Sequence, residues 1–258
     1  MPLDTQYFRE YRRRIGFTNQ QMTKDYLSAK DIVADVDYQY VDSLLARLRD
    51  MYAQLNSTIH ESVRHHNVPD LIKHAIDDPY NQIKRTGLIR NLNNQGRRPE
   101  QVLFNWLRGY ASSEFMRPAI AHAFQVDLLS IESIGDDDLS SQDTFRRTPR
   151  ADLRVREGKK ALRLEVQAGF QGVNDVKQHK CLEAKRVLAE AGQHSICVHC
   201  DFYNGQVAFI RLSSIAENDI HWITRQQMEG QTVFNIDQNR FTWGVMNEPP
   251  LFDELDIE

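Results

Sequence analysis

The segment from residue 151 to 169 reads ADLRVREGKKALRLEVQAG, and its regular alternation restricts the fold more than any other part of the chain. Apolar side chains take every second position on both sides of a polar turn at 157–160: Leu153, Val155, Leu162, Leu164 and Val166. A period of two is typical of strands with one buried face. The segment therefore predicts two antiparallel strands joined by a tight turn.

The predicted hairpin places two carboxylates opposite each other. With the turn at 157–160, residues that pair across the hairpin have numbers that add up to about 317, so that Asp152 pairs with Glu165. Cross-strand neighbours lie roughly 4.5–5.5 Å apart. Gln167 is two positions beyond Glu165, and alternation directs both side chains to the same face of the strand.

Two adjacent carboxylates repel each other unless a positive group lies between them. A Mg²⁺ ion suits this arrangement, because it binds one or two carboxylates together with waters and phosphate oxygens. A second interpretation stays open from spacing alone. The hairpin is then an exposed surface on which Arg154, Arg156 and Arg163 pair with the acidic side chains.

The first 125 residues are expected to be mostly helical. Apolar residues at three- and four-residue spacing predict an amphipathic helix over about 38–62, and Pro99 and Glu100 are suited to begin a long one. The basic segment 82–98 has no acidic residue, and it is expected to be either a solvated loop or a strip that meets phosphates.

The second half alternates between strand and helix patterns. We expect strands at 126–134, 151–155, 161–170, 195–202 and 207–212, a helix that Asn174 caps and Gly192 ends, a partial helix after 213, and a loosely held acidic tail at 247–258. The predicted fold is α/β, with a central mixed β-sheet flanked by helices and a helical N-terminal lobe. The lobe covers residues 1–98 and the core with a C-terminal extension covers 99–258, within one compact domain.

A helix followed by three strands, a helix and a strand, with Asp152 at the second strand and a Glu-x-Gln sequence ending the third, resembles the PD-(D/E)XK nuclease superfamily. Many type II restriction endonucleases belong to it, so the resemblance implies a restriction-endonuclease-like fold. The resemblance covers about residues 99–202. It implies that Asp152, Glu165 and the carbonyl of Val166 bind the metal, and that Glu114 is the acidic residue on the preceding helix.

The chain departs from the family pattern at Gln167, where lysine is usual. A glutamine amide can form hydrogen bonds but brings no charge. Some restriction enzymes of the superfamily have Glu-x-Gln, and either Lys177 or Lys180 on the following helix is a candidate to supply the charge.

The resemblance implies a Mg²⁺-dependent enzyme that cleaves double-stranded DNA at a specific sequence, in which a metal held by Asp152 and Glu165 activates water. A homodimer matches a palindromic site, with the helical lobe contributing to dimerisation or DNA recognition. Five residues are expected to contact DNA: Arg150, Gln171, Asn174, Lys177 and Lys180. The alternatives are a repair or transposition nuclease and an inactive DNA-binding or regulatory module.

Bulk properties agree with a cytoplasmic protein, and the resemblance to restriction enzymes implies a prokaryotic source. No stretch reaches the roughly 18 apolar residues of a membrane helix, and the N-terminus has no apolar signal region. The three cysteines, Cys181, Cys197 and Cys200, are too few for a disulfide framework, and their spacing favours core positions over a zinc site. The net charge of −4 leaves DNA binding open, since a binding cleft needs only local positive potential.

Overall fold

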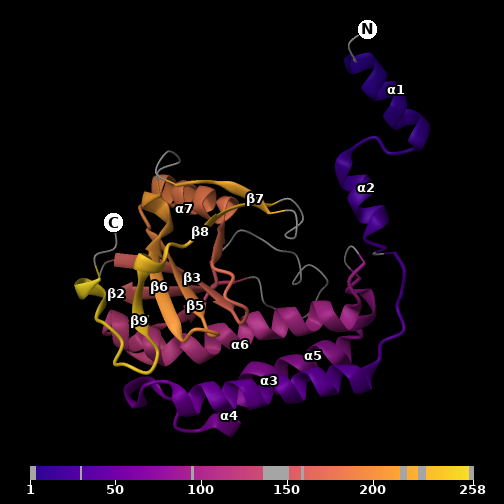
Figure 1. Ribbon diagram of the computed structural model, residues 1–258. Helices are drawn as coiled ribbons and strands as arrows, with labels where there is room; N and C mark the ends of the chain where they lie inside the picture. Colours follow the sequence, from indigo (N-terminus) through magenta and orange to yellow (C-terminus); the bar gives the residue numbers. More distant parts are fainter. Residues whose placement is uncertain are drawn as a thin grey trace.

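The structure is a computed structural model that describes residues 4–29, 31–93, 96–135, 151–157, 160–215, 220–225 and 231–255 (Figure 1). The helices are α1 (Thr5–Ile15), α2 (Gln20–Leu27), α3 (Tyr38–Thr58), α4 (Val68–Ile72), α5 (Asp78–Thr86), α6 (Pro99–Phe124) and α7 (Gln178–Ala191). A π-helical turn, Lys73–Asp77, joins α4 to α5. The strands are β1 (Glu132–Ser133), β2 (Leu153–Glu157), β3 (Lys160–Gly169), β4 (Asp175–Lys177), β5 (Ser195–Asp201), β6 (Gln206–Arg211), β7 (Ile223–Arg225), β8 (Gln231–Asn235) and β9 (Phe241–Gly244).

The largest sheet has six strands in the order β1-β2-β3-β5-β6-β9. Strands β3 and β5 are parallel, whereas the other neighbours are antiparallel, so the sheet is mixed as expected. In the β2–β3 hairpin Leu153 pairs with Leu164 and Val155 with Leu162, which is the register predicted from the position of the turn. A smaller antiparallel sheet has the order β4-β8-β7.

Helices cover the large sheet on both faces. Helix α6 packs on one face with α3 to α5 beyond it, and α7 lies on the other face beside the small sheet (Figure 1). Strand β5 illustrates the alternation that this requires, because Ile196, Val198 and Cys200 join the core on the α6 side while Cys197 joins the core on the α7 side. The predicted α/β fold with a central mixed sheet flanked by helices is therefore confirmed.

Helix α6 is the support of the sheet and runs unbroken from Pro99 to Phe124. Its first residue is the expected proline, which needs no N–H donor at that position. Pro118 does not split the helix, although proline removes one helical donor and the carbonyl of Glu114 loses its usual partner. One hydrophobic core joins residues of α3 to α6 to residues of the large sheet, and the predicted boundary at residue 98 stays a prediction.

The expected helix start at Asn174 is wrong. Residues Asp175–Lys177 form β4, which pairs with β8, and α7 begins only at Gln178. The side chain of Asn174 bonds to Asp201 and His199 instead of capping a helix. Local capping chemistry favoured the helix, but pairing with a strand about 60 residues away prevailed. The expected end of this helix is confirmed, because Gly192 follows it with a φ of 64°.

Three further expectations need correction. Only Glu132–Ser133 of the segment 126–134 form a strand, and Leu128–Ser130 form a 3₁₀ turn. Where a partial helix was expected after 213, the described residues form a 3₁₀ turn at Leu212–Ser214 and the strands β7 and β8, and the remainder of that expectation, at 216–219 and 226–230, lies outside the described residues. The acidic tail is docked, since the rings of Phe252 and Phe124 stack with their centroids 4.5 Å apart.

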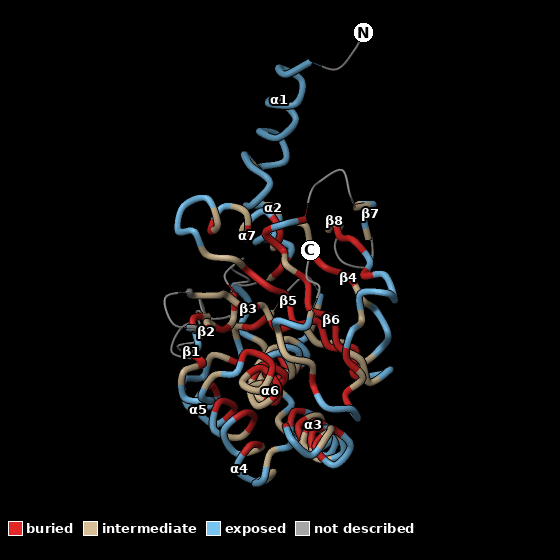
Figure 2. The backbone as a smooth tube through the Cα atoms, turned by 90° about the vertical axis from the view of Figure 1, so that its left-hand side faces the viewer, coloured by how far each residue is buried: buried red, intermediate tan, exposed pale blue. Residues whose placement is uncertain are grey.

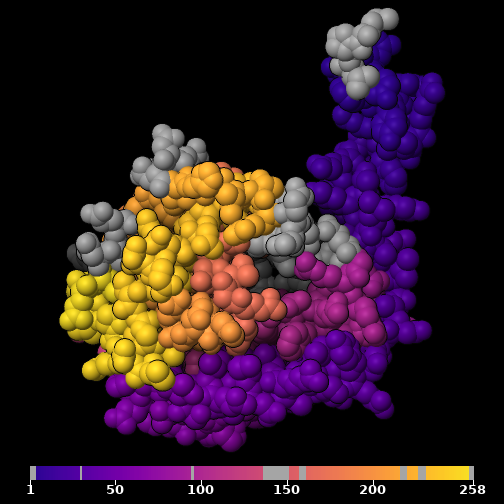
Figure 3. Space-filling view, viewed as in Figure 1, coloured from indigo at the N-terminus to yellow at the C-terminus, as the bar shows by residue number. Residues whose placement is uncertain are grey.

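Helices α1 and α2 form an arm that extends from the body of the protein (Figures 1 and 3). Neither helix has a buried residue, in contrast to α3 and α6 (Figure 2). The base of the arm is anchored, because Asn93 donates hydrogen bonds to the carbonyls of Ala29 and Ile32. None of the helices in the described ranges is both long and apolar enough to cross a membrane.

Candidate active site

A pocket of about 250 Å³ opens between α6, the start of β2 and the middle of β3. It is lined by Asn105, Trp106, Gly109, Tyr110, Ser113, Glu114, Ser133, Asp152, Leu153, Glu165 and Val166. Figure 3 shows a hollow on this side of the molecule, where the segment at the end of β3 meets the magenta of α6. Three predicted site residues, Glu114, Asp152 and Glu165, thus line one pocket together with Val166.

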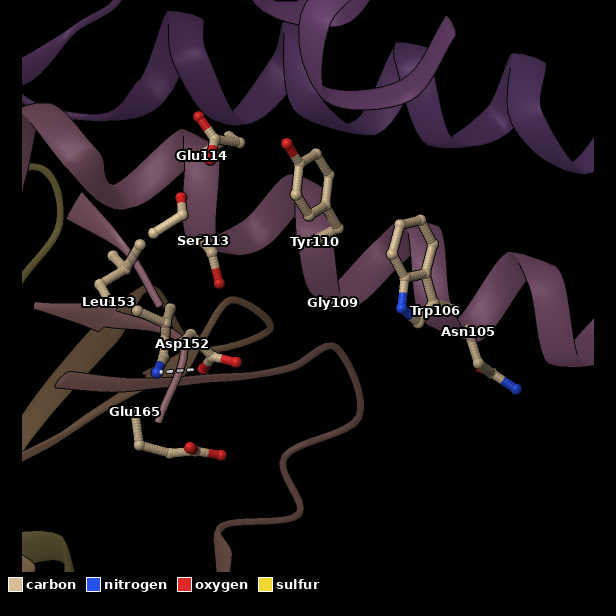
Figure 4. A pocket seen from close by; sticks show the side chains of 11 residues that line it. Asn105, Trp106, Gly109, Tyr110, Ser113, Glu114, Asp152, Leu153 and Glu165 are labelled. Carbon is tan, nitrogen blue, oxygen red and sulfur yellow. Dashed lines mark hydrogen bonds between the residues drawn. The ribbon is translucent and has the colours of Figure 1, made fainter. Parts of the chain in front are cut away.

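Asp152 precedes β2 and is fixed through both its backbone and its side chain. Its amide donates to the carbonyl of Leu164 at 3.1 Å, and its carbonyl accepts from the amide of Ile134 at 2.9 Å. Its Oδ2 atom accepts a hydrogen bond from the backbone amide of Val166 at 2.9 Å. The carboxylates of Asp152 and Glu165 point to the same side in Figure 4.

Glu165 lies on β3 and forms an ion pair with Lys180 from the first turn of α7. The ammonium Nζ is 2.8 Å from each carboxylate oxygen, and the two side chains are only 14% and 18% exposed. Burial raises the pKa of the Glu165 carboxyl, while the ammonium groups of Lys180 and then Lys177 oppose the rise. The predicted candidate lysine on α7 therefore contacts the central carboxylate directly.

Gln167 does not line the pocket, although it lies on the same face of β3 as Glu165. Its Nε2 donates to the backbone carbonyl of Asp175 at 3.0 Å, and its Oε1 accepts a weak bond from the thiol of Cys197 at 3.8 Å. These contacts direct the amide toward β4 and β5. Gln167 thus connects the two sheets beneath the site.

Glu114 lines the pocket from α6, and its carboxylate lies 2.9 Å from Nε of Arg117. Arg117 also donates to the carbonyl of Ile131 and to the hydroxyl of Ser133. In the part of the chain that the structure describes, no three His, Cys, Asp or Glu side chains are grouped closely enough to hold a metal ion. Glu114 is therefore not brought into one ligand set with Asp152 and Glu165.

The donor set of the pocket fits a hard cation. The carboxylates of Asp152, just before β2, and of Glu165, in the middle of β3, offer oxygen ligands. Mg²⁺ binds one or two carboxylates while keeping several waters. The backbone of Val166 lies between them, because its amide already contacts Asp152. Asp152 and Glu165 could therefore hold Mg²⁺.

The residues expected to contact DNA differ in their exposure and in their hydrogen bonds. Arg150 lies outside the described residues. Gln171 is exposed in the loop after β3, and Lys177 is half-buried at the end of β4. Asn174 is engaged on both ends of its amide, since its Nδ2 donates to Asp201 and its Oδ1 contacts His199.

The basic segment 82–98 is not an extended loop. It continues α5 to Thr86 and forms a 3₁₀ turn at Leu88–Asn91. Lys84 lies over the rings of Tyr38 and Tyr80, and Arg98 pairs with the buried Glu100. Part of the positive charge is thus used within the fold.

Two other observations complete the site. Cys181, Cys197 and Cys200 are buried free thiols, as expected for core positions. Trp106 and Tyr110 on α6 line the pocket, and Trp106 also packs against the core that contains Leu103 and Leu107. Helical spacing groups these four residues on one side of the helix, and only the position of β2 and β3 shows that this side meets the pocket.

Comparisons with known proteins find one distant structural similarity. No family model matches the chain, and no curated protein does. Among solved structures the chain is similar to the Holliday junction resolvase of Archaeoglobus fulgidus, with a TM-score of 0.32 and 9% identity, over 55% of this chain and 93% of that one. This similarity is too low to assign an activity.

Proposed function

We propose that this protein hydrolyses phosphodiester bonds of double-stranded DNA with a Mg²⁺ ion held by Asp152, Glu165 and the carbonyl of Val166. The observation that supports the proposal most is the convergence of the two carboxylates on one pocket, with Lys180 bound to Glu165. Two partly buried carboxylates side by side repel each other unless positive charge lies nearby. A bound Mg²⁺ would lower the pKa of water and offset the charge of the phosphate.

The residues around the ion have separate roles in this proposal. The amide of Val166 orients the Asp152 carboxylate. Lys180 supplies the positive charge that Gln167 does not, because its ammonium is beside Glu165 while the Gln167 amide is bound to Asp175. In this proposal Gln171 and Lys177 contact the DNA backbone, and Asn174 holds the loop through its hydrogen bond to Asp201.

We further propose that the enzyme is a site-specific endonuclease of the type II restriction class and acts as a homodimer. The arm supports the dimer, because Tyr7, Phe8, Tyr11, Tyr26 and Leu27 on α1 and α2 are each at least 42% exposed. A second copy of the chain would cover these side chains, and a two-fold symmetric enzyme matches a palindromic site.

Cleavage of phage DNA with and without Mg²⁺ tests the proposal. Discrete fragments are expected with Mg²⁺, and Asp152→Ala and Glu165→Ala should abolish them while leaving DNA binding in metal-free buffer intact. Glu190→Ala, which removes an exposed carboxylate on α7, is the matched control and should cut normally.

The other outcomes identify the alternatives. A smear would indicate a nuclease of low specificity, as in repair or transposition. A salt-dependent gel shift without any cleavage would indicate an inactive DNA-binding module. Normal cutting by either pocket variant would contradict the assignment of the site.

A further inference from the structure

An aromatic pair lines the pocket on the α6 side. Trp106 and Tyr110 are one helical turn apart, and their rings are stacked with centroids 5.4 Å apart and planes 7° from parallel. Both are half-buried, whereas their neighbours Leu103 and Leu107 are fully buried. The helix thus directs aliphatic residues to the core and aromatic faces to the pocket.

A glycine keeps the wall of the pocket open between these two residues. Gly109 lies near the middle of α6, where glycine weakens a helix relative to alanine. A Cβ atom built at this position meets no atom within 4 Å, so packing within the fold does not require glycine here. Gly109 lines the same pocket, and Figure 4 shows it between Tyr110 and Trp106 on α6, across from Asp152 and Glu165.

The flat aromatic surface, the open space and the nearby carboxylates together suit a flat ring that is carried next to a phosphate. We propose that the Trp106–Tyr110 wall binds a single unstacked nucleobase of the DNA whose phosphate reaches Asp152 and Glu165. Bases stack on aromatic side chains independently of sequence, and a pocket of about 250 Å³ accommodates a single base more readily than a base pair. Asn105, Ser113 and Ser133 offer polar groups at the edge of the same pocket. The inference rests on the proposed nuclease function and specifies its substrate.

Binding in metal-free buffer separates this inference from cleavage itself. The probes are two fluorescein-labelled duplexes of equal length, one fully paired and one with a single bulged thymine. We expect the wild-type protein to bind the bulged duplex about tenfold more tightly, because stacking of one base on an aromatic side chain is of this order. Binding of the bulge should also quench tryptophan fluorescence.

Three variants test the wall. Trp106→Ala should abolish the preference and the quenching while leaving affinity for the paired duplex unchanged, and Trp106→Phe should retain the preference. Gly109→Leu, which fills the wall without removing an aromatic ring, should also abolish it. Equal affinity of the wild type for both duplexes, or a preference that survives in Trp106→Ala and Gly109→Leu, would overturn the inference. Absence of cleavage by the wild type would instead count against the nuclease proposal.

Discussion

The ammonium of Lys180 on α7 lies 2.8 Å from the carboxylate oxygens of Glu165 on β3. The pair joins the helix after β4 to the central strand of the candidate site. Gln167, two residues further along β3, brings no charge and is bound to Asp175. A lysine from the next helix thus lies beside the central carboxylate, where β3 itself provides none.

Replacement of Lys180 is therefore expected to impair catalysis. Lys180→Gln removes the positive charge beside Glu165, and loss of a positioned charge or proton donor typically lowers rates by about 10²–10⁴. Single-turnover cleavage at saturating protein measures the effect. Lys185→Gln removes a lysine from the same helix and should cut at the normal rate.

The position of the charge can be exchanged as a second test. Gln167→Lys in the Lys180→Gln background restores a lysine on the same face of β3 as Glu165, so we expect part of the lost rate to return. Melting temperatures of both variants distinguish this effect from a change in stability. A double variant no faster than Lys180→Gln would argue that Lys180 acts through the fold and not through its charge.

The hairpin was the most predictable part of the molecule, for a physical reason. Alternation and a four-residue turn determine register locally, so the pairing of Leu153 with Leu164 followed from sequence positions alone. The convergence of Asp152 and Glu165 followed from the same rule. A candidate lysine on α7 could also be named in advance, because helical spacing defines which residues share a turn.

The elements that the sequence did not predict depend on distant partners. β4 has three residues and exists because Val176 pairs with Phe234, a contact across nearly 60 residues. The orientation of Gln167 depends on the same strand, since its amide bonds to Asp175. The packing of Phe252 on Phe124 could likewise not be predicted from the sequence, because an acidic, proline-containing tail has no local pattern of a packed segment.

The arm gives a prediction about assembly. Tyr26 and Leu27 are 67% and 68% exposed at the end of α2. Replacement of both by glutamate would place charges in the proposed interface, and we expect a dimer in the wild type and a monomer in the variant. Light scattering after size exclusion gives the mass. The control variant is Leu129→Glu, because Leu129 lies on the body of the protein and is 91% exposed. A monomeric wild type would contradict the proposed dimer.

Helix α6 is expected to be a main source of stability. Leu107 is fully buried at the centre of the core beneath the pocket. Leu107→Ala should lower the free energy of unfolding by about 2–5 kcal/mol, because it removes apolar contacts and leaves a cavity. Leu129→Ala, at an exposed position, should change it by about 0.5 kcal/mol or less. Urea denaturation measures both. A loss below about 1 kcal/mol at Leu107 would mean that the core collapses around the smaller side chain.

His199 on β5 is expected to make the stability of the protein sensitive to acid. It is 1% exposed, and among the described residues its Nδ1 has no hydrogen-bond partner, whereas its Nε2 contacts Oδ1 of Asn174 at 3.0 Å. Burial lowers the pKa of His199 to about 4, although the carboxylates of Asp201 and Asp175 oppose the shift. The folded protein therefore holds a neutral imidazole at pH values where an unfolded chain is already protonated.

The difference between the folded and unfolded pKa of His199 determines how the free energy of unfolding changes with pH. Between the unfolded pKa of 6.5 and the folded pKa of about 4 the unfolded chain binds more protons, so the free energy of unfolding falls as pH decreases through that window. A shift of this size corresponds to about 3 kcal/mol. Urea denaturation from pH 7 to pH 4 should show the decline in the wild type and a much weaker one in His199→Gln, whose amide can still donate to Asn174.

The raised pKa of Glu165 acts in the opposite direction, but it is present in both proteins and cancels in the comparison. His66→Gln, at an exposed histidine, should behave as the wild type. Equal pH dependence in His199→Gln and the wild type would show that other groups cause the acid sensitivity, because no other titrating group differs between the two chains.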